Sequence, residues 1–467
     1  MGKQPAIDGA RLAKLASDGR ELYGAMPQPL FSGDACLCHC EPVAHAACSA
    51  GGDPRHGTPP PTAPAERTPL ETRADEVVAL INGKADPEQI FSAGFLKAAS
   101  PAQLAAISAM FIAQLGNAMA VETLNPRGGT RAALVIRFER GTAKGSLAID
   151  PAQENRITGL LFTQLDPVAQ EGVTPAKIAA DLAALPGTVT AWFAPLDGAA
   201  PLVSINPDTP LALGSTFKLY VLAALAEDVK AGRRKWSDVV PLTAKSYPSG
   251  QLQTWPKGSP VTLHTLASMM IAISDNTATD QLIAALGKAR ILELMKASGH
   301  ADPSRNDPFL TTRELFVLKA GGAPQIAGWR KSDTPRRAAI LESRVSEDPT
   351  LEQVTSAFAG GPAALDIEWY ASPADLAKLI GRMRRTADPK AFEIMAINPA
   401  ASAAILANWR YVGFKGSSEP GVINTTWLLT DKGGRDWVLT AGWNNEGAAV
   451  DDVKFVGLAQ RILLLPR

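Results

Sequence analysis

Strand-like segments lie at both ends of one long stretch of this chain, and this arrangement constrains the fold more than any other feature. Runs rich in β-branched and aromatic residues, "TVTAWFAPL" and "APLVSINP", lie at residues 188–207, and the runs "NWRYVGFKG", "INTTWLLTD" and "DWVLTAGWN" lie at residues 408–444. Helical patterns fill most of the sequence from residue 215 to about residue 400. We therefore expect one sheet that both ends of the segment complete together, with helices covering its faces.

A smaller unit is expected ahead of this sheet, at residues 72–166. Helical patterns at 72–83 and 101–116 precede four strand-like runs, which turn-forming sequences such as "NPRGG" and "DPAQEN" separate. Helices followed by a strand meander favour an antiparallel sheet with helices on one face. Polar residues do not converge in this unit, so we interpret it as an accessory or dimerisation domain, followed by the main domain at residues 173–467.

Residues 1–70 have no periodic apolar face and include the Pro-rich linker "GDPRHGTPPPTAPAERTP", so we expect a disordered tail. The four cysteines and His39 and His45 lie in this tail, but their spacing matches no standard zinc pattern, and we expect no metal and no cofactor. The apolar core of a signal peptide is also missing, so the natural start of the chain stays open. The cysteines are Cys36, Cys38, Cys40 and Cys48.

Charge and hydropathy exclude several classes of partner. The chain of 467 residues carries 46 Lys and Arg against 46 Asp and Glu, so it has no overall attraction for nucleic acid or for anionic membranes. No apolar run reaches the length of a membrane-spanning helix. We therefore predict a small-molecule partner, no nucleic acid and no transmembrane segment.

A lysine in an otherwise apolar helix points to chemistry. In "ALGSTFKLYVLAAL", Ser215 and Lys218 are three positions apart and share one face of a helix. Burial lowers the pKa of a lysine, and a lysine without its proton can act as a base. Outside the tail and linker the histidines are His264 and His300, and neither has the companions that a Ser-His-Asp triad needs. We predict Ser215 as a nucleophile and Lys218 as its base.

Two further motifs fit this prediction. "AISDNTATD" places Ser274, Asp275 and Asn276 at the end of an apolar helix. "GFKGSSEPG" places four residues on a predicted strand ahead of a turn, namely Lys415, Gly416, Ser417 and Ser418. The backbone N–H groups of Ser215 and of Ser417 or Ser418 can form an oxyanion hole. Ser274 can relay a proton to the leaving group, Lys415 can help to bind a substrate carboxylate, and Asn276 can bond a substrate amide. The set S-x-x-K, S-D-N and K-T-G is a signature of class A β-lactamases and penicillin-binding proteins.

Residues from about 173 to 467 resemble the serine β-lactamase/penicillin-binding protein superfamily, nearest its class A-like serine hydrolase branch. "GSTFKLYVLAALAEDVKAG" and "EWYASPADLAKLI" carry the resemblance together with the three motifs. It implies an α+β fold, with an antiparallel sheet, helices on both faces and a helical subdomain. The layout is similar to the two-domain β-lactamase-fold protein of clavulanic-acid gene clusters, which implies an NTF2/steroid-isomerase-like first domain. The resemblance also favours a periplasmic or secreted location.

The sequence departs from the family pattern at two places. The third motif reads K-G-S, so a hydroxyl is missing at Gly416 that Ser417 or Ser418 could restore. No E-x-x-x-N pattern, which in class A enzymes holds the deacylating water, lies between Ser274 and Lys415. Glu314, in a capping-box pattern with Thr311, and Glu368 are weak candidates for a deacylation base.

The sequence therefore predicts a serine hydrolase that forms an acyl-enzyme at Ser215 and acts on an ester or amide, possibly a β-lactam. A weakly catalytic protein that binds β-lactams or cell-wall peptides stays open as the alternative. The loop "SYPSGQLQTW" lies at one rim of the cleft if the resemblance holds. We expect Tyr247 and Leu252 to form a wall there for the acyl group, with Trp255 either packed or in contact with substrate.

Overall fold

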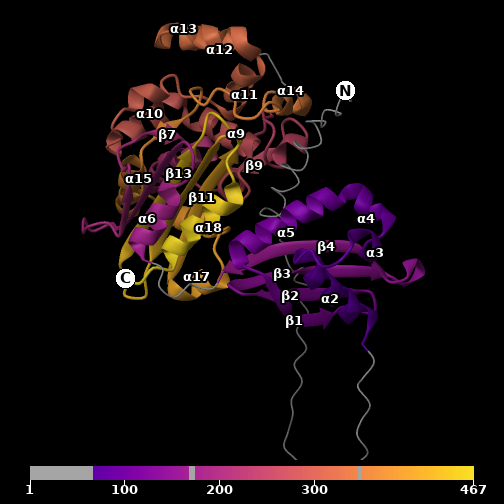
Figure 1. Cartoon of the computed structure of the whole chain (residues 1–467). Coiled ribbons are helices and arrows are strands. Elements are labelled where there is room, and N and C mark those ends of the chain that lie inside the picture. The colour runs from indigo at the N-terminus through magenta and orange to yellow at the C-terminus, as the bar shows by residue number, and fades with distance from the viewer. Residues whose placement is uncertain (1–66, 168–173, 244, 345–349) are drawn as a thin grey trace, which may run out of the picture.

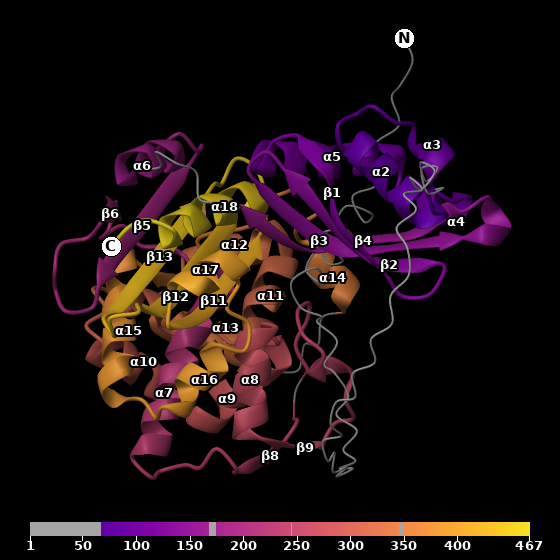
Figure 2. The same cartoon turned by 90° about the horizontal axis from the view of Figure 1, so that it is seen from below.

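The computed structural model describes residues 67–167, 174–243, 245–344 and 350–467. They form a smaller unit, up to residue 167, and a larger unit from residue 174, which lie side by side in Figure 1 and Figure 2. The cysteine-bearing tail, for which we expected disorder and no metal, lies outside the described residues.

The smaller unit packs four helices against an antiparallel meander in the order β1-β2-β3-β4. Its first helix begins at Pro69, because the side chain of Thr68 accepts from the N–H of Glu71 and the Glu71 carboxylate accepts from the N–H of Thr68. The expected helices and meander are confirmed, whereas the NTF2-like character stays a prediction. The elements are α2 (Pro69–Ile81), α3 (Pro87–Ile90), α4 (Ala93–Ala98), α5 (Pro101–Leu115), β1 (Ala118–Pro126), β2 (Arg131–Phe138), β3 (Gly141–Asp150) and β4 (Arg156–Pro167).

The larger unit has a five-stranded antiparallel sheet in the order β11-β12-β13-β5-β6. Strand β13 pairs with β5 from Trp437 opposite Pro195 to Asn444 opposite Thr188, so the two ends of the segment complete one sheet, as expected. Strand β11 forms one edge, and the site described below lies along it. The strands are β5 (Thr188–Pro195), β6 (Val203–Ile205), β11 (Tyr411–Glu419), β12 (Val422–Thr430) and β13 (Asp436–Asn444).

Helices cover both faces of this sheet, and strands such as β12 are therefore buried on both sides. Trp427 packs with the cluster under α6 (Pro175–Ala183), α17 (Ala403–Asn408) and α18 (Asp452–Leu463), whereas Leu428 packs with the cluster on the other face. Helix α18 also contacts α5 of the smaller unit. The other face carries α7 (Lys218–Lys230), α8 (Leu263–Ala272), α9 (Asn276–Leu286), α10 (Lys288–Ala297), α11 (Thr312–Ala320), α15 (Pro373–Thr386) and α16 (Lys390–Met395).

Short elements complete the helical subdomain. A 3₁₀ turn at Gly214–Phe217 joins β7 (Leu211–Ala212) to α7, and β7 pairs with β10 (Tyr370–Ala371). Strands β8 (Val239–Pro241) and β9 (Pro260–Thr262) pair beside α8. Helices α12 (Gly322–Arg330) and α13 (Thr334–Ser343) project at the top of Figure 1, and α14 (Leu351–Ser356) follows them.

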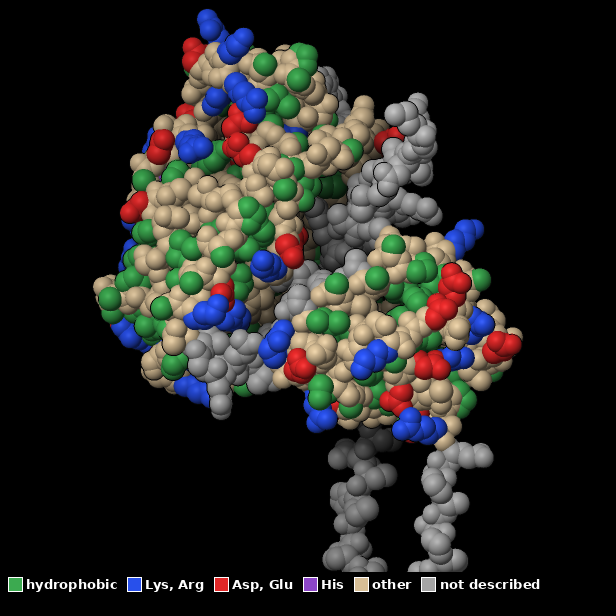
Figure 3. All heavy atoms as spheres, in the orientation of Figure 1, with side chains coloured by type: hydrophobic (Ala, Val, Ile, Leu, Met, Phe, Trp, Pro, Cys, Tyr) green, Lys and Arg blue, Asp and Glu red, His purple; other side chains and the backbone are tan. Residues whose placement is uncertain are grey.

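The surface mixes both signs of charge. Figure 3 shows Lys and Arg side chains interspersed with Asp and Glu across one face, as the balanced composition suggests. Among the described residues, no helix combines the length and the apolar character needed to cross a membrane.

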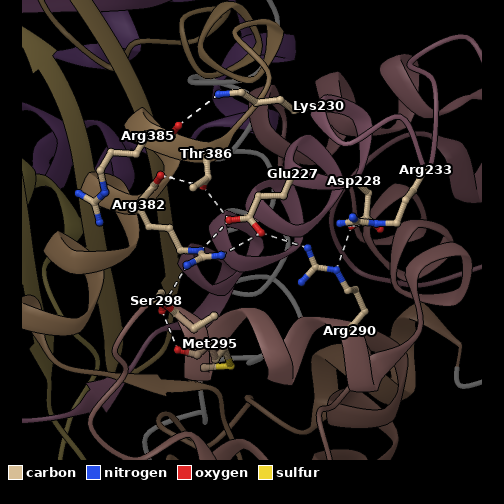
Figure 4. Close-up of polar contacts among 11 residues, drawn as sticks. Glu227, Asp228, Lys230, Arg233, Arg290, Met295, Ser298, Arg382, Arg385 and Thr386 are labelled. Carbon is tan, nitrogen blue, oxygen red and sulfur yellow. Dashed lines mark hydrogen bonds and ion pairs between the residues drawn. The ribbon is translucent and has the colours of Figure 1, made fainter.

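A charge network fixes the C-terminal end of α7 against α10 and α15 (Figure 4). The Glu227 carboxylate accepts from the Nε of Arg382 at 2.6 Å, from the Oγ1 of Thr386 at 2.7 Å and from the Nη2 of Arg290 at 3.1 Å. The Glu227 side chain is only 11% exposed. Burial opposes ionisation, but the hydrogen bonds from Arg382, Thr386 and Arg290 outweigh it and hold the pKa of Glu227 below its ordinary value.

We predict that Glu227→Gln lowers the free energy of unfolding by about 1–3 kcal/mol at pH 7, because it removes charge-assisted hydrogen bonds at a largely buried carboxylate. A depressed carboxyl pKa stabilises above the ordinary pKa of glutamate, and that contribution is lost as the pH falls through the folded value. The difference between the two proteins should therefore shrink in acid. Urea unfolding at several pH values measures it.

The matched control is Glu393→Gln, at an exposed carboxylate that pairs with Lys390 on the same helix. The Glu393→Gln substitution should change the free energy of unfolding by no more than about 0.5 kcal/mol. Equal losses in the two variants would contradict a special role for the Glu227 network.

Candidate active site

Ser215 is the one residue between positions 211 and 226 that is not fully buried. It follows Gly214, whose φ of +47° lies in the left-handed region and whose added Cβ would stand 3.0 Å from the Oγ of Ser417. Behind it, the rings of Phe217 and Trp369 stack with centroids 3.6 Å apart. The chain therefore presents Ser215 on the 3₁₀ turn that leads into α7, while its neighbours as far as Ala226 are held in the core.

Lys218, the first residue of α7, is completely buried. Its Nζ donates to the carbonyl oxygen of Ser274 at 2.6 Å, to the Oγ of Ser274 at 3.0 Å and to the Oδ1 of Asn276 at 2.8 Å. Ser274 has a φ of +59°, a conformation that non-glycine residues rarely adopt and that is often found at functional sites. This backbone turn brings both the carbonyl and the hydroxyl of Ser274 to the same lysine nitrogen.

Lys415 approaches the same hydroxyl from the sheet. Its Nζ lies 3.1 Å from the Oγ of Ser274 and 2.5 Å from the carbonyl oxygen of Gly416, and the residue is only 3% exposed. Burial lowers the pKa of Lys415 to about 7. Two buried lysines from distant parts of the sequence thus share the hydroxyl of one half-buried serine.

The backbone N–H groups of Gly416 and Ser418, in the K-G-S-S segment, point to the outer edge of β11. The N–H of Asn445 donates to the carbonyl of Gly421, which makes these two residues a hydrogen-bonded pair. From Gly421 onward, every second residue, such as Ile423, therefore bonds to β13. The residues between them, such as Asn424, bond to β11. Ser417, opposite Asn424, therefore bonds toward β12, and the N–H of Ser418 points to the outer edge. The 3₁₀ turn that carries Ser215 contacts this strand.

The hydroxyls of both serines are used within the protein. The Oγ of Ser417 donates to the carbonyl of Leu213 at 2.5 Å, on the side of the nucleophile. The Oγ of Ser418 donates to Asp452 at the start of α18, on the opposite face of the sheet. Of the two, only Ser417 places a hydroxyl on the face of the candidate site, and Ser418 contributes its backbone.

The S-D-N motif also anchors the rim loop at residues 246–255. Asp275 caps α9 through the N–H of Ala278, and its other oxygen accepts from the N–H groups of Gln251 and Leu252 at 2.6 and 2.9 Å. The N–H of Asn276 donates to the carbonyl of Ser249. The loop is thereby fixed to the motif that holds Lys218.

The structure adds to one predicted role and changes another. The side chain of Asn276 accepts from Lys218 and donates one N–H to the carbonyl of Tyr247, so it positions the lysine, while its bond to a substrate amide stays a prediction. Leu252 is completely buried in the main core, so its predicted place in the wall of the cleft is wrong. Its apolar side chain packs inward because its backbone is bonded to Asp275. Tyr247 is half-buried, and Trp255 is 41% exposed.

The two candidate carboxylates have other partners. Glu314 forms the expected capping box with Thr311 and an ion pair with Lys288 at 2.6 Å. Glu368 is buried against Lys319 at 2.5 Å. Each carboxylate therefore has a lysine as its partner, and no contact with Ser215 is found for either among the described residues.

Other features bear on cofactors and on residues that the sequence did not reveal. Within the described residues, no group of His, Cys, Asp and Glu is arranged to hold a metal ion. His300 is buried, with its Nε2 2.8 Å from the carbonyl of Tyr370 and its Nδ1 accepting from the N–H of Asp302, so it is structural.

The sequence analysis missed Gly214 and Trp369, although a glycine directly before a predicted nucleophile is a signal for a tight backbone turn.

Comparison with known proteins gives a family match for part of the chain. Residues 175–405 match the model described as "Beta-lactamase enzyme family". No curated protein matches the chain. The similarity to the protein of clavulanic-acid gene clusters stays a prediction.

Several solved structures are similar to part of the chain. The β-lactamase from Sphaerobacter thermophilus DSM 20745 is 22% identical, with 63% of this chain and 98% of that chain covered and a TM-score of 0.44. A point mutant of PBP-A, in an acyl-enzyme complex with penicillin G, is 17% identical over 62% and 94% of the two chains, with a TM-score of 0.43. A β-lactamase from Chitinophaga pinensis DSM 2588 is 15% identical over 62% and 96%, also with a TM-score of 0.43.

We predict that Lys415→Met raises the free energy of unfolding by about 1–3 kcal/mol at pH 6–7, because it removes a buried ammonium group. The folded pKa of about 7 lies below the unfolded value, so wild-type stability rises as the pH increases from about 7 toward the ordinary pKa of lysine. The advantage of the variant should therefore disappear over that range. Urea unfolding between pH 6 and 10 tests this, with Lys454→Met, at an exposed lysine, as the control.

Proposed function

We propose that the larger unit is a serine hydrolase that forms an acyl-enzyme at Ser215. The observation that carries the proposal is the convergence of Lys218 and Lys415 on the hydroxyl of Ser274. The half-buried Ser215 lies three residues before Lys218, on the 3₁₀ turn that leads into the same helix. The match of residues 175–405 to the β-lactamase enzyme family supports the same reaction class.

The first step is nucleophilic attack. Lys218, in its neutral form, accepts the proton of the Ser215 hydroxyl while the Oγ forms a bond to the substrate carbonyl carbon. The negative charge moves to the carbonyl oxygen, which the N–H groups of Ser215 and Ser418 would stabilise. Asn276 contributes by holding the amine of Lys218 in place.

The second step expels the leaving group. The bond between the carbonyl carbon and the leaving atom breaks, and Ser274 passes a proton to that atom while it takes one from Lys218. Lys415, as a cation, favours the transfer by stabilising negative charge around the Ser274 oxygen. The products are the acyl-Ser215 ester and the free alcohol or amine.

Hydrolysis of the acyl-enzyme is expected to be slow. Glu314 pairs with Lys288 and Glu368 pairs with Lys319, so each candidate base already has a cationic partner that opposes the uptake of a proton from water. An activated ester should therefore give a fast first turnover and a slower steady state, and a β-lactam should give a persistent adduct. The same observation favours the second candidate, a weakly catalytic binding protein for β-lactams or cell-wall peptides.

We predict that Ser215→Ala abolishes the burst of nitrophenol from p-nitrophenyl acetate and lowers turnover on the order of 1,000-fold or more. Lys218→Met should lose the burst in the same way, because the hydroxyl then lacks its base. Stopped-flow absorbance measures both. An undiminished burst in Ser215→Ala, with the fold intact, would rule out the assigned nucleophile.

We also predict that Tyr247→Ala raises KM for bulky acyl esters by about tenfold, with little change for acetyl esters, because the ring provides apolar contact at the rim. Steady-state kinetics with a matched series of p-nitrophenyl esters tests this. Leu252→Ala is the contrasting variant, since it removes a core side chain and should lower stability by about 2–5 kcal/mol. If Tyr247→Ala affects acetyl and bulky esters equally, the loop has no role in selectivity.

A further inference from the structure

A second buried charge cluster lies at the far end of the strand that carries Lys415. The ammonium group of Lys319, on α11, donates to the Oε1 of Glu368 at 2.5 Å and to the Oε1 of Glu419 at 2.7 Å. The side chains of Lys319 and Glu368 have no exposed area, and that of Glu419 is 11% exposed. These three residues, here called the Lys319 cluster, have no part in the mechanism above.

The Lys319 cluster connects segments that are far apart in the sequence. Glu419 is the last residue of β11 and directly follows Ser418. Glu368 lies just before β10, which pairs with β7, and β7 leads into Ser215. One ammonium group therefore links the strand that presents the Ser418 N–H to the segment that leads to the nucleophile.

Three alternate residues of β11 anchor the strand on the face of the site. Lys415 contacts the Oγ of Ser274, Ser417 donates to the carbonyl of Leu213, and Glu419 bonds to Lys319. The first two anchors precede Ser418 in the chain, and Glu419 supplies the anchor on its other side. Since β11 is an edge strand, its position depends on such side-chain anchors more than that of an inner strand does.

The charges of the cluster argue for a role in positioning. Burial and the neighbouring Glu419 raise the pKa of Glu368 well above its ordinary value. Replacing a buried ionic cluster by apolar residues is often neutral or stabilising, so this cluster is weak evidence for a contribution to stability. The Lys319 cluster instead fixes geometry, because each of its hydrogen bonds holds one backbone segment in place.

We propose that the Lys319 cluster is a positioning device for acyl transfer, which holds the N–H of Ser418 where it meets the oxygen of the tetrahedral intermediate. The proposal rests on the proposed function of Ser215. Glu419 acts through the adjacent backbone and does not touch the substrate.

Glu419→Ala tests the proposal with little risk to the fold, because it leaves Lys319 paired with Glu368. The readouts are kcat and KM for p-nitrophenyl acetate and Kd for phenylboronic acid, whose serine adduct is tetrahedral. We expect kcat and boronate affinity to fall by the same factor, on the order of 10- to 100-fold, since a displaced oxyanion donor acts only on the tetrahedral state. KM should change by about twofold or less. Glu419→Gln keeps an acceptor for Lys319 and should restore most of the lost kcat and most of the lost boronate affinity.

Glu314→Ala is the matched control, because it breaks an ion pair and the capping box of the same helix, α11, without a contact to β11. It should leave kcat and boronate affinity unchanged. Wild-type values in folded Glu419→Ala, or equal losses in Glu314→Ala, would overturn the positioning role while Ser215-dependent acylation persists. Absence of that acylation in the wild type would instead overturn the proposed function, and the positioning role with it.

Discussion

The candidate site depends on the burial of two lysine side chains against one hydroxyl. Lys218 and Lys415 lie 3.0 and 3.1 Å from the Oγ of Ser274, and the two lysines are 0% and 3% exposed. Removing such groups from water is costly, and here backbone carbonyls and an amide oxygen supply part of the compensation. The left-handed backbone of Ser274, the anchored rim loop and the edge strand all serve to hold this arrangement.

The sequence reveals those parts of the fold that depend on local pattern. The strand-like runs near residues 188 and 436 have the β-branched and aromatic composition of buried strands, and they pair with one another in β5 and β13. Helix boundaries that depend on a side-chain cap are harder to predict. Helix α2 was expected from residue 72 but begins at Pro69, because Thr68 caps it. Lys218, Ser274 and Lys415, which come from three separate motifs, lie in contact, as the shared chemistry of these motifs predicts.

Contacts between distant residues could not be predicted in the same way. Nothing in the pattern around Leu252 shows that Asp275 bonds its N–H and directs its side chain into the core. The use of both ends of Asn276 within the protein depends on Lys218 and on the carbonyl of Tyr247, which only the fold brings near. The partnership of Lys319 with Glu368 and Glu419 has no local signature, because the three residues come from separate segments.

The central claim is that Ser215 carries the acyl group. Its most direct test is to mix the protein with p-nitrophenyl acetate, stop the reaction in acid within the first turnover, and locate the added acetyl group by peptide mass spectrometry. The account predicts one acetyl group, on the peptide that contains Ser215 and on that hydroxyl. An acetyl group found on Lys218, on Ser274 or on a residue outside the larger unit, with Ser215 unmodified, would contradict it.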